Sequence, residues 1–244
     1  MPAEALNEWL LRLNEAVEQT NHCHLCNLVP GRPIPFFGDV LRARILTVGV
    51  NPSDQEFNEE RRWDAITNPR QWQKRLLNHF HISGVPAWCW FETWSICLEL
   101  LGVSYGDRIA AHIDISPRAT TPMLAEVTDK AKFRAMVEHD VKWFFELLHQ
   151  LPQVQLLLVA GPIPRANGQK QQLADFIRAQ CENHDSRWVD GQPLPSLITS
   201  GQTEGIPVFV CPYEANVDGL YAMVRQVYRN RELLRRLSVP KRTN

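Results

Sequence analysis

Short runs of apolar residues alternate with longer amphipathic segments along most of this chain. Four of the runs are six to nine residues long and end at turn residues, as buried strands do. These predicted strands are residues 45–50, 108–116, 154–161 and 205–212. Other segments place apolar residues at helical spacing, which predicts helices at residues 3–19, 70–79, 90–102, 129–150, 168–181 and 214–237.

Strands that alternate with helices predict an α/β fold, because parallel strands are joined by helical crossovers. Right-handed crossovers place helices on both faces of the sheet. We therefore predict a three-layer α/β/α sandwich around a central, mainly parallel four-stranded sheet. The chain shows neither an internal repeat nor a flexible linker, so residues 1–244 are interpreted as one domain. An N-terminal helix and a Cys- and Pro-rich segment occupy residues 1–40, and the part from His22 to Phe37 is expected to be irregular.

The composition is that of a globular protein, with 44% hydrophobic and 22% charged residues. No apolar run reaches the roughly 18 residues that span a bilayer, and the N-terminus lacks the basic start of a secretory signal. We therefore expect a cytoplasmic monomer that does not associate with membranes. In that compartment the six cysteines are expected to stay reduced or to bind a metal.

Charge is distributed unevenly along the chain. The formal net charge is only −1, but residues 225–244 contain seven basic residues and one acidic residue. The predicted helix at residues 214–237 is therefore basic toward its end and lies on an acidic body. Such a face is a candidate for contacting phosphates, and a solvated helix face without a ligand is the alternative.

The loop after the first predicted strand is the most informative segment. Gly49 permits close approach of another backbone or a ligand, and Pro52 biases Asn51 away from helical geometry. In open α/β sheets, ligands bind at the carboxyl ends of the strands. The carboxamide of Asn51 is therefore predicted to project at a ligand-binding edge. A strand-ending Asn-Pro turn without a chemical role is the alternative.

The sequence VGVNPS at residues 48–53 resembles the first motif of the uracil-DNA glycosylase superfamily. It is most similar to the GINPG-like motif of the mismatch-specific and thymine-type glycosylases, with Ser53 where that motif usually has glycine. The resemblance also fits the order of strands from about residue 20 to residue 237. It implies that Asn51 holds the water that attacks C1′ of the sugar. The base-binding residues that it implies in this loop are Gly49, Val50, Pro52 and Ser53.

Two further side chains are expected to contact the base through the same resemblance. An aromatic residue near the position of Phe57 stacks on the flipped base in the family, and core packing is the alternative for Phe57. Asp114 lies near the end of the second predicted strand, where the family reads the base edge. A carboxylate accepts a hydrogen bond from N4 of cytosine and cannot donate one to O4 of uracil, which favours a cytosine-type base. The alternatives are that Asp114 caps a turn or pairs with Arg118.

The segment after the fourth strand departs from the family pattern. The uracil-specific enzymes have a His-Pro-Ser motif there, whose His stabilises the departing base, whereas this chain has Cys211-Pro212-Tyr213. Tyr213 is predicted to contact the base or to fill the gap left by the flipped nucleotide. Burial of Tyr213 under the last helix is the alternative. The residues predicted to contact DNA are Arg118, Arg165, Asn216, Arg225 and Arg229.

Two cysteines near the N-terminus, Cys23 and Cys26, have a spacing that occurs in metal sites. The Cys-x-x-Cys pattern also resembles the iron–sulfur members of the superfamily. Those enzymes need two further cysteines, and residues 116–142 contain none. A zinc site that adds His22 or His24 stays open, but packed free thiols are favoured. No cofactor is therefore predicted.

These residues together predict a monofunctional DNA glycosylase that flips a uracil-like or modified pyrimidine, such as a modified cytosine, out of the stack. No motif places a lysine to form a Schiff base, so the predicted product is an abasic site without strand cleavage. Base excision of this kind would serve DNA repair or defence against phage. A non-catalytic DNA-binding module on the same fold and an α/β enzyme that acts on a nucleotide or nucleoside are the alternatives.

Overall fold

The computed structural model of the chain describes residues 1–20, 32–52, 68–81, 89–120, 129–165, 167, 169–183, 197–198, 206–210 and 217–229. Within these residues, six strands form one sheet and two form a second, small sheet. The strands of the larger sheet, in spatial order, are β1 (Phe36–Phe37), β3 (Ala110–Asp114), β2 (Ile45–Gly49), β4 (Leu156–Val159), β8 (Ile206–Val210) and β7 (Leu197–Ile198). Neighbouring strands are parallel, except that β1 runs antiparallel to β3.

The protein has an α/β fold with a mixed sheet of six described strands, which corrects the predicted number of four strands and adds the antiparallel β1. The four predicted strands correspond to β2, β3, β4 and β8, which are adjacent and parallel. Phe36 and Phe37 lie in the passage that was expected to be irregular, yet they pair with Ile113 and His112 as β1. Two residues are too few to show the alternation of a strand, so the pattern did not predict β1.

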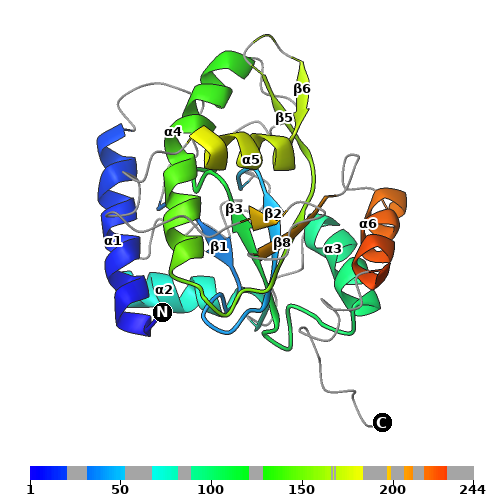
Figure 1. The fold of residues 1–244 in the computed structure, drawn as a ribbon. Coiled ribbons are helices and arrows are strands. Elements are labelled where there is room, and N and C mark those ends of the chain that lie inside the picture. The colour runs from blue at the N-terminus through cyan, green and yellow to red at the C-terminus, as the bar shows by residue number, and fades with distance from the viewer. Residues whose placement is uncertain are drawn as a thin grey trace.

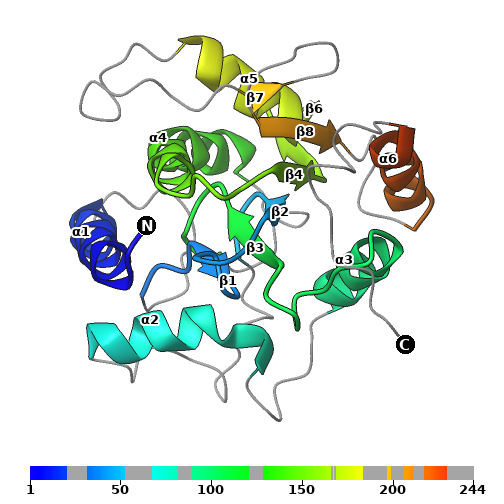
Figure 2. The same cartoon turned by 60° about the horizontal axis from the view of Figure 1, so that its bottom comes forward.

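Helices cover both faces of the larger sheet (Figures 1 and 2). The helices of the described residues are α1 (Ala3–Thr20), α2 (Pro69–Leu77), α3 (Cys89–Leu100), α4 (Lys130–His149), α5 (Leu173–Asn183) and α6 (Val217–Arg229), with a 3₁₀ turn, η4, at His79–His81. Helix α5 begins later than predicted because β6 (Lys170–Gln172) precedes it and pairs with β5 (Pro162–Pro164). None of these helices is long and apolar enough to cross a membrane.

Local residues fix where three of the helices begin or end. The side chain of Asn68 accepts a hydrogen bond from the backbone N–H of Arg70 at 2.9 Å and caps the start of α2. The side chain of Asp129 does the same for α4 by accepting from the N–H of Lys132 at 2.9 Å. Gly102 follows the end of α3 with a φ of 75°, a conformation that favours glycine.

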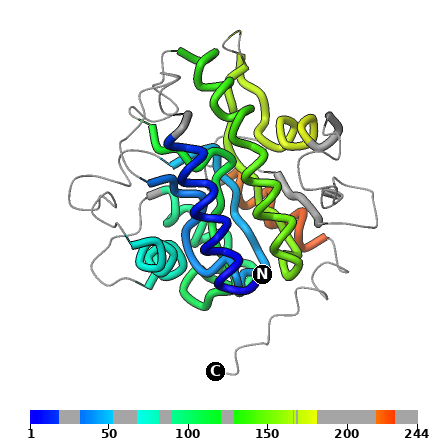
Figure 3. The backbone as a smooth tube through the Cα atoms, turned by 90° about the vertical axis from the view of Figure 1, so that its left-hand side faces the viewer, coloured from blue at the N-terminus to red at the C-terminus, as the bar shows by residue number. Residues whose placement is uncertain are grey.

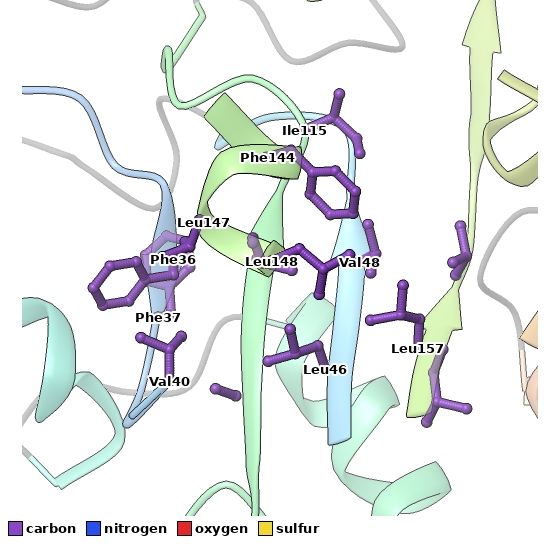
Figure 4. Packing of buried hydrophobic residues seen from close by; sticks show 14 of the residues in the cluster. Phe36, Phe37, Val40, Leu46, Val48, Ile115, Phe144, Leu147, Leu148 and Leu157 are labelled. Carbon is purple, nitrogen blue, oxygen red and sulfur yellow. The ribbon is translucent and has the colours of Figure 1, made fainter. Parts of the chain in front are cut away.

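One face of the sheet packs against α4. The apolar side chains of α4 lie over the even-numbered residues of β2, because alternate residues of a strand face opposite sides. Figure 4 shows this cluster, which includes Phe144, Leu147, Leu148, Leu46, Val48 and Leu157. Helix α1 runs beside α4 (Figure 3), and the ring centroids of Trp9 and Trp143 are 6.3 Å apart. Burial of each such side chain contributes about 1.5–3 kcal/mol to folding.

The opposite face of the sheet carries polar residues at its carboxyl end. Thr47 and Gly49 of β2 are in register with His112 and Asp114 of β3, and all four residues share this face. Helix α3 packs here, with the ring centroid of Phe91 5.3 Å from that of His112. The fold therefore places polar side chains beneath an aromatic layer and next to the end of β2.

Candidate functional site

Asn51 lies directly beyond the carboxyl end of β2, where the backbone stays joined to the segment after β3. The N–H of Ile115 donates to the carbonyl oxygen of Gly49 at 3.1 Å, and the N–H of Ser116 donates to that of Val50 at 2.9 Å. The side chain of Asn51 is half-buried. These backbone hydrogen bonds hold Asn51 at the edge where ligands bind in open α/β sheets.

The carboxamide of Asn51 is fixed through its nitrogen. Nδ2 donates to the backbone oxygens of Pro52 at 2.8 Å and Arg118 at 3.1 Å, and to the hydroxyl of Thr120 at 3.0 Å. A backbone oxygen only accepts hydrogen bonds, so the nitrogen must lie on this side of the carboxamide. Oδ1 points the other way, and no side chain or backbone group of the described residues donates to it. This oxygen can therefore accept a hydrogen bond from a water molecule.

A buried ion pair fixes the segment that holds Asn51. Nε of Arg118 lies 2.8 Å from Oδ2 of Asp140, an α4 residue that is completely buried. Oγ of Ser116 donates to the same oxygen at 2.7 Å, and Arg118 also donates to the backbone oxygen of Val17 at 3.2 Å. These contacts join α1, α4 and the segment after β3. They fix the position of the Arg118 backbone oxygen that Asn51 uses.

This placement corrects the predicted role of Arg118 in DNA binding. Its side chain is only 4% exposed and is engaged by Asp140, so its guanidinium does not face the surface. Removing one partner of a buried ion pair costs about 3–5 kcal/mol, so we assign Arg118 a structural role. The alternative in which Arg118 pairs with Asp114 is also wrong, since Asp114 pairs with His112.

Asp114 and His112 fill the space above Gly49. Oδ1 of Asp114 lies 3.4 Å from Nε2 of His112, and the two residues are 4% and 2% exposed. A Cβ atom on Gly49 would lie 2.6 Å from Oδ1 of Asp114 and 3.0 Å from Nε2 of His112. Glycine is therefore needed at this position because two polar side chains of β3 lean over the backbone of β2.

The pair is the end of a buried chain of polar side chains. Oγ1 of Thr47 lies 2.8 Å from Nδ1 of His112 and 2.7 Å from the hydroxyl of Tyr105. Burial raises the pKa of Asp114 above its ordinary value, and the neighbouring His112 lowers it in part. Burial also raises the pKa of Tyr105, so its hydroxyl stays protonated and can donate. The chain can therefore hold a proton at the Asp114 end.

Sequence reasoning did not find Thr47, Tyr105 or His112. One signal was present, because His112 and Asp114 are two positions apart in a predicted strand and must share a face. That they meet Thr47 and Gly49 depends on the register of β2 and β3, which the pattern does not specify. The hydroxyl of Tyr105 comes from a turn before β3 and depends on the tertiary fold.

The other predicted site residues are placed as follows. Gly49, Val50 and Pro52 are buried beside Asn51 at the end of β2. Arg165 is exposed just after β5, which continues from the carboxyl end of β4, while Arg225 and Arg229 are exposed on α6. The predictions that lie outside the described residues are those for Ser53, Phe57, Tyr213, Asn216, Cys23 and Cys26. Within the described ranges, no three His, Cys, Asp or Glu side chains form a group that could hold a metal ion.

No family model matches the chain, and no curated protein is significantly similar to it in sequence. The carboxyl edge of β2 and β3 combines an amide oxygen that can hold a water molecule with a buried carboxyl–imidazole pair that can hold a proton. Asn51 lies directly beyond the carboxyl end of β2, and the buried pair lies beside it at the carboxyl end of β3.

Proposed function

We propose that the protein is a monofunctional DNA glycosylase that excises a uracil-like or modified pyrimidine and leaves an abasic site. A three-layer α/β/α architecture like that of the uracil-DNA glycosylases would provide the scaffold. The observation that carries the proposal is the carboxamide of Asn51. Its nitrogen is held by Arg118 and Thr120, so its oxygen is available for a water molecule at the carboxyl edge of β2.

The reaction follows from what that oxygen can do. A flipped nucleotide would enter with its sugar beside Asn51, and the N-glycosidic bond would break toward a sugar with oxocarbenium character. Oδ1 of Asn51 accepts a hydrogen bond from the water and directs the water's oxygen toward C1′. The carboxamide is neutral, so its contribution is orientation, and its three hydrogen bonds supply the rigidity that orientation needs.

Exposed arginines would supply the contacts with the DNA backbone. Arg225 and Arg229 lie four positions apart on α6 and are both exposed, so they share one face of the helix. Arg165 is exposed beyond the end of β4. Each arginine that neutralises a phosphate makes binding more sensitive to salt.

One observation favours a second candidate, a non-catalytic DNA-binding module. The hydrogen bonds of Asn51 also tie the end of β2 to the segment after β3, which a purely structural asparagine would do as well. The two candidates differ in what the loss of the side chain does. The enzyme releases a base, and Asn51→Ala abolishes that release without weakening DNA binding. A binding module releases no base, with or without the side chain of Asn51.

The test is base release from duplex and single-stranded oligonucleotides that contain uracil, a G·T mismatch, cytosine, hydroxymethylcytosine or glucosylated hydroxymethylcytosine. Alkali converts abasic sites to strand breaks, which are counted on a gel. We expect release from at least one substrate and its loss in Asn51→Ala. Thr120→Ser, which keeps a hydroxyl for Nδ2 of Asn51, should retain most of the rate, whereas Thr120→Val should lower it. Intact DNA binding with no release from any substrate would contradict the proposal.

A further inference from the structure

The water-holding step leaves the His112–Asp114 pair without a role, although the pair lies at the same sheet edge as Asn51. Two titratable side chains are buried there with their polar atoms 3.4 Å apart. Within the described part of the chain, Oδ2 of Asp114 receives no hydrogen bond. Burying an ionisable pair without a function is costly, so the pair calls for a chemical explanation.

The hydroxyl of Tyr105, at one end of the buried series of polar side chains, determines which group donates in each hydrogen bond. The hydroxyl of Tyr105 keeps its proton and donates to Oγ1 of Thr47, the acceptor that the described residues offer it. Thr47 then donates to Nδ1 of His112 at 2.8 Å, because its other acceptor, the backbone oxygen of Ala111, is 3.4 Å away. An imidazole that accepts at Nδ1 carries its hydrogen on Nε2. Nε2, which carries that hydrogen, lies 3.4 Å from Oδ1 of Asp114, so Oδ2 is the carboxyl oxygen left for an acidic proton.

Building on the glycosylase function proposed above, we propose that Asp114 is a catalytic acid that protonates N3 of a flipped cytosine-type base, with His112 as its positioning residue. The proton moves from Oδ2 of Asp114 to N3. As the C1′–N1 bond breaks, its electron pair stays with N1 and the base leaves as a neutral molecule. The water held by Asn51 forms the new C1′–O bond, and the proton that it loses restores the carboxyl group of Asp114.

This acid determines which bases can leave. N3 of cytosine has a lone pair that accepts a proton, whereas N3 of uracil and of thymine already carries a hydrogen. A substituent at C5 of cytosine leaves N3 unchanged, so modified cytosines stay within the substrate class. The proposal thus narrows the substrates to bases with an unprotonated N3, and it supplies the leaving-group assistance that the absent family histidine would otherwise give.

The groups around the pair support this assignment. Burial raises the pKa of Asp114, which favours the protonated carboxyl, and His112 is the neighbour that lowers it. Of the other titratable groups packed nearby in the described residues, Cys97 of α3 acts on Tyr105, and the ring of His79 packs against the rings of Phe37 and Phe91. The state of Asp114 is therefore controlled mainly by its burial and by His112.

The test uses the cytosine-type base that the protein releases fastest. Its single-turnover release rate is measured from about pH 5 to pH 9. For the wild type we expect the rate to fall tenfold per pH unit above the pKa of Asp114. Asp114→Asn should lose about 10²–10⁴-fold at low pH and lose the falling limb. His112→Gln removes the group that lowers the pKa of Asp114, so the falling limb should move to higher pH. A role of His112 in packing alone would change the rate but not this midpoint.

A second measurement does not depend on activity. The ¹⁵N chemical shifts of His112 in the free wild-type protein should show Nδ1 unprotonated and Nε2 protonated, and Thr47→Val should disturb that state. Base release that is independent of pH in the wild type, or a falling limb that survives in Asp114→Asn, would overturn the acid role and leave the glycosylase function standing. No release from any substrate would overturn both.

Discussion

Replacing Gly49 with alanine tests the geometry of the site directly. The added Cβ would lie 2.6 Å from Oδ1 of Asp114, 3.0 Å from Nε2 of His112 and 3.2 Å from Cε1 of the same ring. Both side chains are buried, and their strand is held to β2 by backbone pairing, so neither can move freely. Overpacking of this kind costs about 1–3 kcal/mol. For a chain of this size each kcal/mol lowers Tm by about 2–4 °C, so we expect a fall of roughly 2–12 °C.

The assay is thermal and urea unfolding of Gly49→Ala with two comparison variants. Gly106→Ala is the matched control, because its new Cβ would meet nothing closer than Oγ of Ser104 at 3.7 Å. In Gly49→Ala combined with Asp114→Ala the carboxylate that the methyl group meets is gone. The double variant should therefore be more stable than the sum of the single effects by about 1 kcal/mol or more. Additive effects, or a Gly49→Ala variant as stable as the control, would refute the positions described for the side chains of Asp114 and His112.

Three further predictions concern single contacts. Thr47→Val keeps the shape of the side chain but leaves two buried polar groups without a partner, so it should lower the free energy of unfolding in urea by about 1–3 kcal/mol. An unchanged stability would contradict the two hydrogen bonds of Thr47. Arg118→Met should lower the free energy of unfolding by about 3–5 kcal/mol and leave the salt dependence of DNA binding unchanged. Arg225→Ala and Arg229→Ala should each reduce the slope of log affinity against log salt by about 1, with little effect on stability. Because the folded-state pKa of Asp114 is raised, its stabilising contribution is full at low pH and is lost as the pH rises through that pKa. The Tm of Asp114→Asn relative to the wild type should therefore rise between pH 4 and pH 8, and a constant difference would contradict the raised pKa.

The sequence pattern predicts the main strands because each is a continuous apolar run, as strands buried on both faces are. It does not predict β1, since Phe36–Phe37 is too short to show a period. It also assigns residues 170–172 to a helix, although Lys170–Gln172 is polar and becomes strand β6 only by pairing with β5. Short strands of this kind depend on partners that are distant in the sequence.

The geometry of the candidate site likewise depends partly on the local sequence and partly on contacts between residues that are far apart in the chain. The Gly-x-Asn-Pro turn at the end of β2 is local, so the position of Asn51 at the sheet edge follows from the chain itself. The hydrogen bonds that orient Asn51 come from residues 118 and 120, which the fold brings near through the pairing of β2 and β3. The burial of Arg118 is another distant effect, because its partner Asp140 lies on α4. A basic residue in a loop gives no sign of such a partner.

We propose that Asn51 directs water to C1′ of a DNA nucleotide. The most direct test is mass spectrometry of both products, the free base and the strand that lost it, with wild type and Asn51→Ala at DNA saturation. For the wild type we expect an intact free base and an uncut abasic strand in equal amounts. For Asn51→Ala we expect neither product at unchanged DNA affinity. Equal yields from both proteins, or a wild type that binds DNA and yields no free base from any substrate, would contradict it.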